Sequence, residues 1–251
     1  MPSHKHIISG NWFQQTFDAL YPILYAHRTI EAAEAESIFS IEQTNIQQND
    51  RVLDLCCGGG RHIAHLRNVS DHVVGLDYSS HLLEIARETV GNEQPLIRGD
   101  MRHLPFVDHF DVLVNYFTSF GYFRDAEENE KVVRDMTLAL KSGGRFFIDY
   151  MCKDWAIANL EEETRRSAEG FQVYERRWIE ADGSRINKST SISRGDDEIK
   201  HTGESVQLYT TDEFSTLLTN GGLIIDNLYG NYAGSPCAPE FPRMIAVGRR
   251  A

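Results

Sequence analysis

The sequence predicts an α/β protein in which a parallel β-sheet carries helices on both faces. Apolar, strand-like segments alternate with helix-like segments between residues 51 and 150. This spacing is typical of βαβ units, whose right-handed crossovers place helices on both sides of the sheet. The first unit contains the glycine-rich stretch "CCGGGRH" between a strand and a helix. The chain of 251 residues fits one domain with an added layer.

The parallel part of the sheet is expected to contain strands separated by helices. The strand-like segments are "RVLDLC", "HVVGLD", "PLIRGD", "FDVLVNYF" and "RFFIDY". Helices are expected at "GGRHIAHLRN", "SSHLLEIARETV" and "AEENEKVVRDMTLAL". Ser79 or Ser80 would cap the second of these helices, and "KSGG" would close the third.

The segments on either side of this unit have other patterns. Residues 12–45 show helix-like periodicity, which Pro22 is expected to divide into two helices. Residues 151–210 indicate an inserted antiparallel layer, with a hairpin turn at "DG" and a further strand at "GESVQLYT". A helix capped by Thr211, with Glu213 close behind, and two last strands, "LIIDNLYG" and "RMIAVGRR", complete the chain.

The composition narrows the class of protein. A net charge of −12 disfavours broad nucleic-acid binding, which needs clustered Lys and Arg. No apolar run approaches the roughly 18 residues that cross a membrane, and "MPSHKHIISGNWFQQ" contains no apolar core of a signal peptide. A cytoplasmic protein with no membrane partner is therefore expected.

The cysteines do not have the spacing of a metal or redox site. The four cysteines include no CxxC pair, so no metal is expected. Cys56 and Cys57 are interpreted as packing residues that point to opposite faces at the end of an extended strand.

The glycine-rich stretch has the features of a ligand-binding turn at the end of a strand. Glycines there let the backbone approach a ligand, and amides at the next helix start can bind an anionic group. A dinucleotide fingerprint, GxGxxG, would need glycine or alanine in place of Ile63, which disfavours a nicotinamide-dependent oxidoreductase. The pattern that fits is Asp54-x-Cys56-x-Gly58-x-Gly60. Its acid can accept hydrogen bonds from a cationic amine.

Acidic residues also end the next two strand segments. Asp77 ends "VVGLD" and can bind both hydroxyls of a ribose. Asp100 ends "LIRGD" and can accept from an adenine amine, with the Met101 amide at a ring nitrogen and Tyr78 along the adenine face. Each acid alone is as consistent with a capped turn. Acids at the ends of three successive strands, beside a glycine turn, indicate a nucleoside site.

With these residues the chain resembles the class I S-adenosylmethionine-dependent methyltransferases. The resemblance is strongest over residues 50–150, and Cys56 departs from it because the family usually has glycine there. "LYTTDEFSTLLTNGGL" and "GSPCAPEFPRMIAVGRR" are similar to the tail of a bacterial small-molecule methyltransferase subgroup. The matching segments are "VLDLCCGGGRH", "VVGLDYSS", "LIRGDMRHLPF", "FDVLVNYFTSFGYF" and "LKSGGRFFIDY".

The resemblance implies a Rossmann-like sheet of seven strands in the order 3-2-1-4-5-7-6, with the last strand antiparallel. It implies S-adenosylmethionine as the cofactor. Asp77 would hold the ribose, and Asp100 and Met101 the adenine. Gly58 and Gly60 would pass beside the methionine part.

Two further regions are expected to complete the site. Because N-terminal helices commonly cover the donor in this family, residues 1–45 are expected to form a helical lid. Tyr21 or Arg28 would bind the donor's carboxylate from this lid, unless both are surface contacts. The inserted layer, residues 151–210, is expected to cover the substrate, with contacts drawn from Tyr174, Trp178, Tyr209 and Tyr232.

The loop "NYFTSFGYF" follows the fourth strand and lies where the methyl group is expected. Asn115 would position the donor's amine or the substrate, and Asn115, Tyr116 and Tyr122 are the candidate catalytic residues. Phe117 or Phe120 is expected to belong to the core instead. His62 is expected to pack at a helix start and not to act as a base.

The sequence therefore predicts methyl transfer to a nitrogen or oxygen of a small-molecule substrate by direct displacement. The donor is already activated, so alignment is the main contribution of the protein. A single domain, as a monomer or homodimer, is expected. An RNA methyltransferase and a nucleoside-binding module without catalysis are the alternatives.

Overall fold

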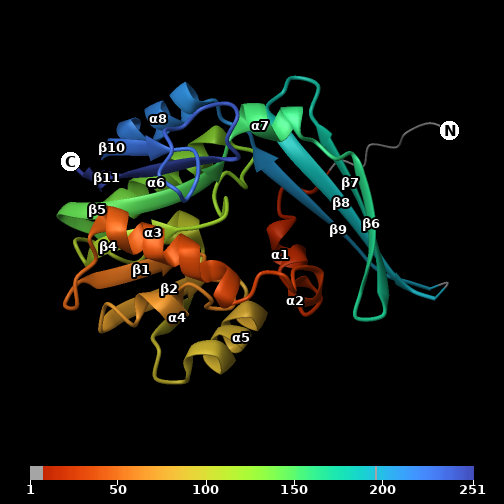
Figure 1. Ribbon diagram of the computed structural model, residues 1–251, viewed down its shortest axis with the longest axis horizontal. Coiled ribbons are helices and arrows are strands. Elements are labelled where there is room, and N and C mark those ends of the chain that lie inside the picture. The colour runs from red at the N-terminus through yellow and green to blue at the C-terminus, as the bar shows by residue number, and fades with distance from the viewer. Residues whose placement is uncertain (1–7, 196) are drawn as a thin grey trace.

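The computed structural model describes residues 8–195 and 197–251, and it places a seven-stranded sheet beside a four-stranded one (Figure 1). The larger sheet has the order β10-β11-β5-β4-β1-β2-β3. β11 is antiparallel to both of its neighbours. Both observations confirm the prediction, because β10 and β11 come sixth and seventh among these strands along the chain. The strands are β1 (Arg51–Leu55), β2 (His72–Asp77), β3 (Leu96–Arg98), β4 (Phe110–Asn115), β5 (Leu140–Met151), β10 (Leu223–Tyr229) and β11 (Arg243–Arg250).

Parallel pairing aligns the strand ends that carry the predicted site residues. Asp54 of β1 lies beside Gly75 of β2 and Val114 of β4. Asp77 and Asn115 are the last residues of β2 and β4. Three polar residues therefore meet at the carboxyl edge of the sheet, where ligands bind in open α/β folds.

Helices cover both faces of the larger sheet. They are α3 (Glu34–Thr44), α4 (Ile63–Leu66), α5 (Ser80–Val90), α6 (Ala126–Ala139) and α8 (Thr211–Asn220). On one face α3, α4 and α5 enclose an apolar cluster that includes Phe39, Ile63 and Leu83. On the other face α6 and α8 enclose a cluster that includes Val132 and Phe214. Within the described ranges, no helix is long and apolar enough to cross a membrane.

The N-terminal region is less helical than its periodicity predicts. Two four-residue helices, α1 (Phe13–Thr16) and α2 (Tyr21–Leu24), precede a 3₁₀ turn at Glu31–Ala33 and then α3. Pro22 was expected to separate two helices, but it lies in the first turn of α2, where no amide hydrogen is needed. Residues 1–7 of the expected lid lie outside the described part of the chain.

The inserted layer is an antiparallel sheet in the order β6-β7-β8-β9. Pairing of β7 with β8 across the "DG" turn confirms the predicted hairpin. The sequence does not predict β6, because "ETRRSA" has no apolar alternation to mark it. A short helix, α7 (Lys153–Ala158), precedes the sheet. The strands are β6 (Glu163–Ala168), β7 (Phe171–Ile179), β8 (Arg185–Arg194) and β9 (Asp197–Gln207).

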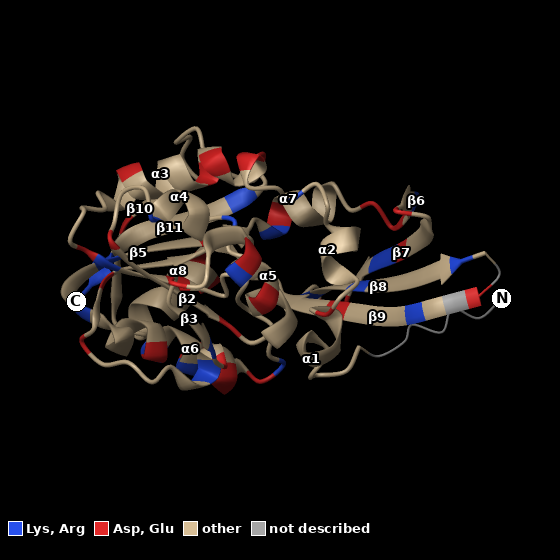
Figure 2. Ribbon diagram, turned by 90° about the horizontal axis from the view of Figure 1, so that it is seen from below, with Lys and Arg blue, Asp and Glu red and all other residues tan. Residues whose placement is uncertain are grey.

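The N-terminal helices α1 and α2 lie between the two sheets (Figures 1 and 2). Thr16 Oγ1 is 2.6 Å from Oγ1 of Thr202 in β9. Arg166 of β6 donates from Nη2 to the carbonyl of Leu24 over 2.7 Å. Leu24 also packs against apolar residues of β7 and β8. The four-stranded sheet is therefore packed against the segment that contains α1 and α2.

Two element boundaries differ from the expected ones. The N-cap of α8 is Thr210 and not Thr211, because Thr210 and Glu213 have the three-residue spacing of a reciprocal capping box. The "KSGG" stretch lies inside β5, which begins at Leu140, because pairing with β4 resumes after an irregularity in register. The cap of α5 is Ser79, as one of the two predicted alternatives.

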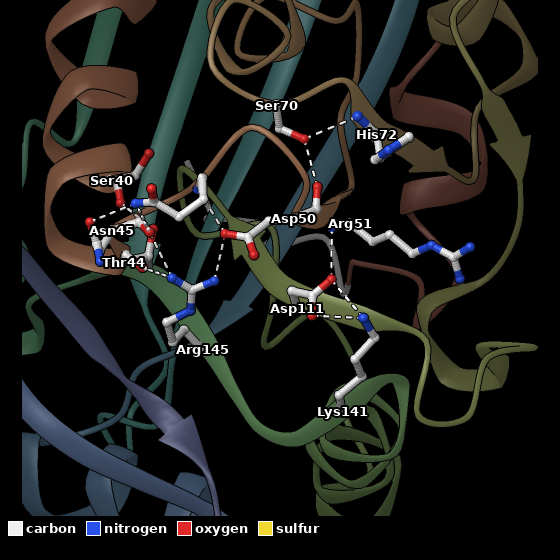
Figure 3. Close-up of polar contacts among 11 residues, drawn as sticks. Ser40, Thr44, Asn45, Asp50, Arg51, Ser70, His72, Asp111, Lys141 and Arg145 are labelled. Atoms are coloured by element: carbon white, nitrogen blue, oxygen red, sulfur yellow. Dashed lines mark hydrogen bonds and ion pairs between the residues drawn. The ribbon is translucent and has the colours of Figure 1, made fainter.

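A polar network closes the amino-terminal ends of the strands, away from the predicted site (Figure 3). Arg145 of β5 donates to the carbonyls of Thr44 and Asn45 over 2.8 and 2.7 Å, and to Asp50 Oδ2 over 2.6 Å. These carbonyls belong to the end of α3, where the helix leaves its last acceptors unpaired. Arg145 therefore joins the end of α3 to the start of the sheet.

We expect Arg145→Met to lower the free energy of unfolding by about 1–3 kcal/mol, since it removes hydrogen bonds between charged groups and carbonyls. Urea denaturation measures this. Arg51→Met is a matched control, because the Arg51 guanidinium has no partner among the residues drawn in Figure 3; its effect should stay within about 0.5 kcal/mol. Equal losses in both variants would show that the network does not hold α3.

Candidate active site

A cavity of about 760 Å³ lies at the carboxyl ends of β1, β2 and β4. Its lining comes from the glycine turn, the loop after β4, the N-terminal region and the inserted sheet. Most of the predicted site residues line it: Tyr21, Arg28, Cys56, Gly58, Asp77, Tyr78, Met101, Tyr116 and Tyr122. The others do not line it: Asp54, Gly60, Asp100 and Asn115.

The glycine turn follows a left-handed backbone path. The φ angle is +62° at Cys56, +54° at Gly58 and +79° at Gly60. A residue with a Cβ atom costs roughly 1–2 kcal/mol in this region, which explains why glycine is usual where this chain has Cys56. β1 ends at Leu55, so the expectation that Cys56 and Cys57 point to opposite faces of an extended strand is wrong.

The remaining parts of the turn serve packing. A Cβ atom on Gly60 would lie 3.2 Å from the Cβ atom of Ala86, so the glycine allows α5 to approach. Burial raises the pKa of the Cys56 and Cys57 thiols well above their usual range, which disfavours the reactive thiolate form. In the part of the chain that the structure describes, no group of three or more His, Cys, Asp or Glu side chains is placed to hold a metal ion.

Asp77 connects the glycine turn to the start of α5. Its Oδ2 accepts from the Gly58 amide over 2.8 Å, and its Oδ1 accepts from the Ser79 amide over 2.9 Å. Burial raises the pKa of Asp77, and these amide bonds oppose the shift. Each carboxylate oxygen keeps a second lone pair, so Asp77 can still accept from hydroxyl groups in the cavity.

Asp100 is engaged by its own neighbour. Arg102 donates to its carboxylate from Nε over 3.1 Å and from Nη2 over 2.6 Å. Partial burial would raise the pKa of Asp100, but the Arg102 bonds and charge outweigh it and lower the pKa. Met101 between them is buried and lines the cavity. The contact of Asp100 with adenine stays a prediction.

Two buried oxygens near the turn have no partner. Oδ2 of Asp54 and Oδ1 of Asn115 are buried without a hydrogen bond to any described residue. Asn115 Nδ2 donates to the Leu55 carbonyl over 2.9 Å, which fixes the orientation of the amide. Burial, and then the charge of Asp77, raises the pKa of Asp54 to about 7. Both orphan atoms are hydrogen-bond acceptors, and neither residue belongs to the cavity lining.

The loop after β4 is held in a strained conformation by Asp149. The φ angles of Phe117 and Thr118 are +56° and +59°, a region that side chains rarely adopt. The Phe117 amide donates to Asp149 Oδ2 over 2.8 Å, and the Thr118 amide donates to the Asp149 carbonyl over 2.9 Å. Arg243 and Tyr232 complete the network, each 2.6 Å from the Asp149 carboxylate. Such strain persists only where the surroundings fix it.

Sequence reasoning missed Asp149 and Arg243. The one sequence feature that indicates Asp149 is its place as an acid inside the apolar strand "RFFIDY". A buried acid needs a charged or polar partner. The partner lies 94 residues further along the chain, so its identity is not readable from local pattern.

Phe117 lines the cavity, whereas Phe120 is fully buried, which confirms that one of the two belongs to the core. The guanidinium carbons of Arg61, Arg28 and Arg243 lie 4.5, 5.3 and 5.5 Å from the Phe117 ring centroid. Distances within about 6 Å are typical of cation–π contacts. Positive charge is therefore concentrated around this ring.

His62 is stacked on the candidate residue Tyr116. Their ring centroids are 3.7 Å apart with an angle of 8° between planes. His62 Nε2 is 2.7 Å from Glu36 Oε2, and Tyr116 Oη is 2.5 Å from Ser40 Oγ. Burial lowers the pKa of His62 well below its usual value and raises that of Glu36 to about 7. Glu36 and Ser40 therefore hold the two rings in place. His62 packs at the start of α4, as expected.

Tyr21, Tyr25 and Arg28 come together although they do not share one helix. α2 ends at Leu24, yet Arg28 Nη1 donates to Tyr21 Oη over 2.8 Å and its Cζ lies 4.2 Å from the Tyr25 ring centroid. No ion pair joins Arg28 to a carboxylate of the described residues. Arg28 is therefore placed to bind an anionic group in the cavity.

The inserted sheet contributes residues that the sequence did not single out. The four aromatic residues expected as substrate contacts, Tyr174, Trp178, Tyr209 and Tyr232, do not line the cavity. Its lining from this sheet consists of Arg177, Lys188, Glu204 and Val206. A rule that favours aromatic contacts misses them, because Lys188 and Glu204 are a cross-strand pair whose charges look like an ordinary solvated face.

The raised pKa of Asp54 makes the stability of the ligand-free protein depend on pH. The folded state holds a proton on Asp54 that the unfolded chain loses near pH 4. Stability is therefore lost as pH rises from about 4 to about 7, and the loss ends above that window. Relative to Asp54→Asn, which cannot ionise, the wild type should lose about 1–3 kcal/mol between pH 5 and pH 7. Urea denaturation of both proteins at several pH values measures this; a constant difference would contradict the assignment.

Known proteins match the part of the chain that forms the larger sheet and the glycine turn. The family model described as "Methyltransferase domain" matches residues 52–144. The dTDP-3-amino-3,4,6-trideoxy-alpha-D-glucopyranose N,N-dimethyltransferase of Streptomyces venezuelae is 24% identical over 224 residues, which cover 86% of this chain and 93% of that protein.

Solved structures share the fold. A S-adenosylmethionine-dependent methyltransferase from Clostridium acetobutylicum has a TM-score of 0.77 and 18% identity, with 92% of this chain and 96% of that chain covered. An amino pentose methyltransferase from Micromonospora echinaspora, solved with S-adenosylmethionine bound, has a TM-score of 0.68 and 20% identity, with 92% and 97% covered. Residues 52–144 therefore match a methyltransferase domain, and the chain has the fold of S-adenosylmethionine-dependent methyltransferases.

Proposed function

We propose that the protein transfers a methyl group to an amine nitrogen of a small molecule, and that a nucleotide-linked amino sugar is its substrate class. The observation that carries the proposal is one cavity of about 760 Å³ that joins the donor residues of the larger sheet to polar groups of the inserted sheet. Cavities of this size hold small molecules. The relative from Streptomyces venezuelae is an N,N-dimethyltransferase of a dTDP-amino sugar, which supports nitrogen as the acceptor atom.

The charge of the cavity supports a substrate with phosphate groups. Arg28, Arg61, Arg177, Lys188 and Arg243 line it, whereas its carboxylates are Asp77 and Glu204. This excess of cations stands out in a protein with a net charge of −12. Guanidinium groups bind phosphate through paired hydrogen bonds.

At one end of the cavity the residues fit a nucleoside. S-Adenosylmethionine, when bound, supplies a methyl group that its sulfonium already activates. Asp77 accepts from the ribose hydroxyls through the lone pairs that the Gly58 and Ser79 amides leave free. Tyr78 and Met101 line the adenine end.

At the other end the residues fit an amino acid group. Arg28 and Tyr21 bind the carboxylate, because Arg28 has no competing carboxylate among the described residues. Asp54 and Asn115 offer unpaired oxygens near the turn, and the ionised form of Asp54 favours the ammonium group. The left-handed backbone at Cys56 and Gly58 keeps the turn close to the ligand.

The rest of the chain aligns the acceptor. Tyr116 and Tyr122 line the cavity, and the Asp149 network fixes the loop that carries them. Residues 8–45 of the expected lid region serve as the lid, and the described residues of the stretch 151–210 cover the substrate. Alignment and exclusion of water account for the rate increase, because the donor needs no further activation.

We also propose that the protein is a single domain that acts in the cytoplasm as a monomer or homodimer. A net charge of −12 disfavours an RNA substrate, whose phosphate backbone would be repelled.

A pair of acceptors tests the reaction. We expect the protein to add one or two methyl groups, seen by mass spectrometry, to the dTDP-3-amino sugar of the Streptomyces venezuelae relative. The analogue with a hydroxyl at the same carbon should stay unmodified. Methylation of the hydroxyl analogue alone would contradict nitrogen as the acceptor, and binding of the donor without transfer to any amine of a wider panel would favour a non-catalytic module.

We expect Asp77→Ala to weaken S-adenosylmethionine binding at least tenfold, or about 1.4 kcal/mol, because bonds to a charged acceptor contribute about 1.5–3 kcal/mol each. Isothermal calorimetry measures the affinity. Asp71→Ala is the control, since Asp71 is exposed at the opposite end of β2 and bonds only to Gln48 among the described side chains. Undiminished binding in a folded Asp77→Ala protein, or tighter binding of NAD by the wild type, would refute the ribose assignment.

A further inference from the structure

We propose that Glu204 binds the acceptor amine in its ammonium form and takes the proton that must leave before methyl transfer, an inference that rests on the proposed function. Nothing in the sequence motifs assigns a role to Glu204. It lies on β9 of the inserted sheet and lines the cavity.

The position of Glu204 is fixed through one of its two oxygens. Lys188, its cross-strand partner on β8, places Nζ 2.7 Å from Glu204 Oε1. Tyr25 donates from Oη to the same oxygen over 2.9 Å. Lys188 Nζ also contacts Tyr25 Oη. The three groups therefore brace one side of the carboxylate.

The second oxygen, Oε2, is left for a ligand. It forms no hydrogen bond or ion pair with a described residue, and the Glu204 side chain is 23% exposed. The other carboxylate in the lining is that of Asp77, which already accepts from two amides beneath the ribose end. His62 lines the cavity as well, but it is held between Tyr116 and Glu36. Glu204 is thus the acid available to an amine.

Glu204 also lies near the site of methyl transfer. Glu204 and Tyr122 line the same cavity as Cys56 and Gly58 of the glycine turn. An amine bonded to Oε2 would therefore lie in the cavity that the glycine turn lines.

Proton transfer to Glu204 precedes methyl transfer. The ammonium nitrogen gives one proton to Glu204 Oε2 and regains its lone pair. That lone pair forms a new N–C bond to the methyl carbon while the C–S bond breaks, and the bonding electrons stay on sulfur as a neutral thioether. Glu204 releases its proton to water when the methylated product leaves.

Glu204→Gln tests this, because glutamine keeps the size and one acceptor but cannot take the proton. With the dTDP-3-amino sugar as acceptor, we expect kcat/KM to fall at least tenfold at pH 7. The loss should shrink as pH rises toward the pKa of the free amine, since water then removes the proton. Affinity for S-adenosylmethionine should stay within about twofold. Glu163→Gln, on the edge strand of the same sheet and outside the cavity lining, should match the wild type.

Binding gives a second readout that does not depend on turnover. Calorimetry on protein saturated with S-adenosylhomocysteine should show that the wild type and Glu163→Gln prefer the amine over its hydroxyl analogue. Glu204→Gln should lose this preference. Wild-type kcat/KM in Glu204→Gln, or a loss that is equal at every pH, would overturn the role of Glu204 while leaving the proposed function standing. A wild type that methylates no amine would overturn both.

Discussion

The two hydrogen bonds that Asp77 accepts from the amides of Gly58 and Ser79 fix the floor of the cavity. One carboxylate at the end of β2 thereby positions the turn that follows β1 and the helix that follows β2. The turn needs this support, because its path runs through left-handed backbone at a cysteine. Parallel pairing of β1 with β2 and β4 brings Asp54, Asp77 and Asn115 to the same edge. The remaining walls are arranged around that edge.

Charge compensation shapes those walls. Asp149 holds the strained loop after β4 and pairs with Arg243 behind it. Glu36 lies 3.4 Å from Arg61 on the same side of the cavity. Figure 2 shows basic residues on the strands of the inserted sheet and acidic residues on several helices of the larger layer. Five Lys and Arg residues line the cavity of a protein whose net charge is −12, which agrees with the proposed substrate that carries phosphate.

Local patterns predicted the larger sheet and most of the cavity floor, because strand ends and turns are set by residues close together in sequence. Local patterns failed to predict features that depend on contacts between residues far apart in the sequence. The first part of the periodic N-terminal segment forms only two four-residue helices, and Thr16 of α1 contacts Thr202 of β9. Arg243 and the Lys188–Glu204 pair gain their place from contacts across the chain. Cys56 was recognised as a departure from the family, but only the backbone angle explains why glycine is usual there.

A crystal structure with S-adenosylhomocysteine and the dTDP-3-amino sugar would test the central claim most directly. The account predicts ribose hydroxyls within hydrogen-bond distance of Asp77, the homocysteine carboxylate at Arg28, and the sugar amine on Glu204 Oε2 facing the sulfur. A sugar amine pointing away from the sulfur, or a nucleoside bound elsewhere than on Asp77, would contradict it.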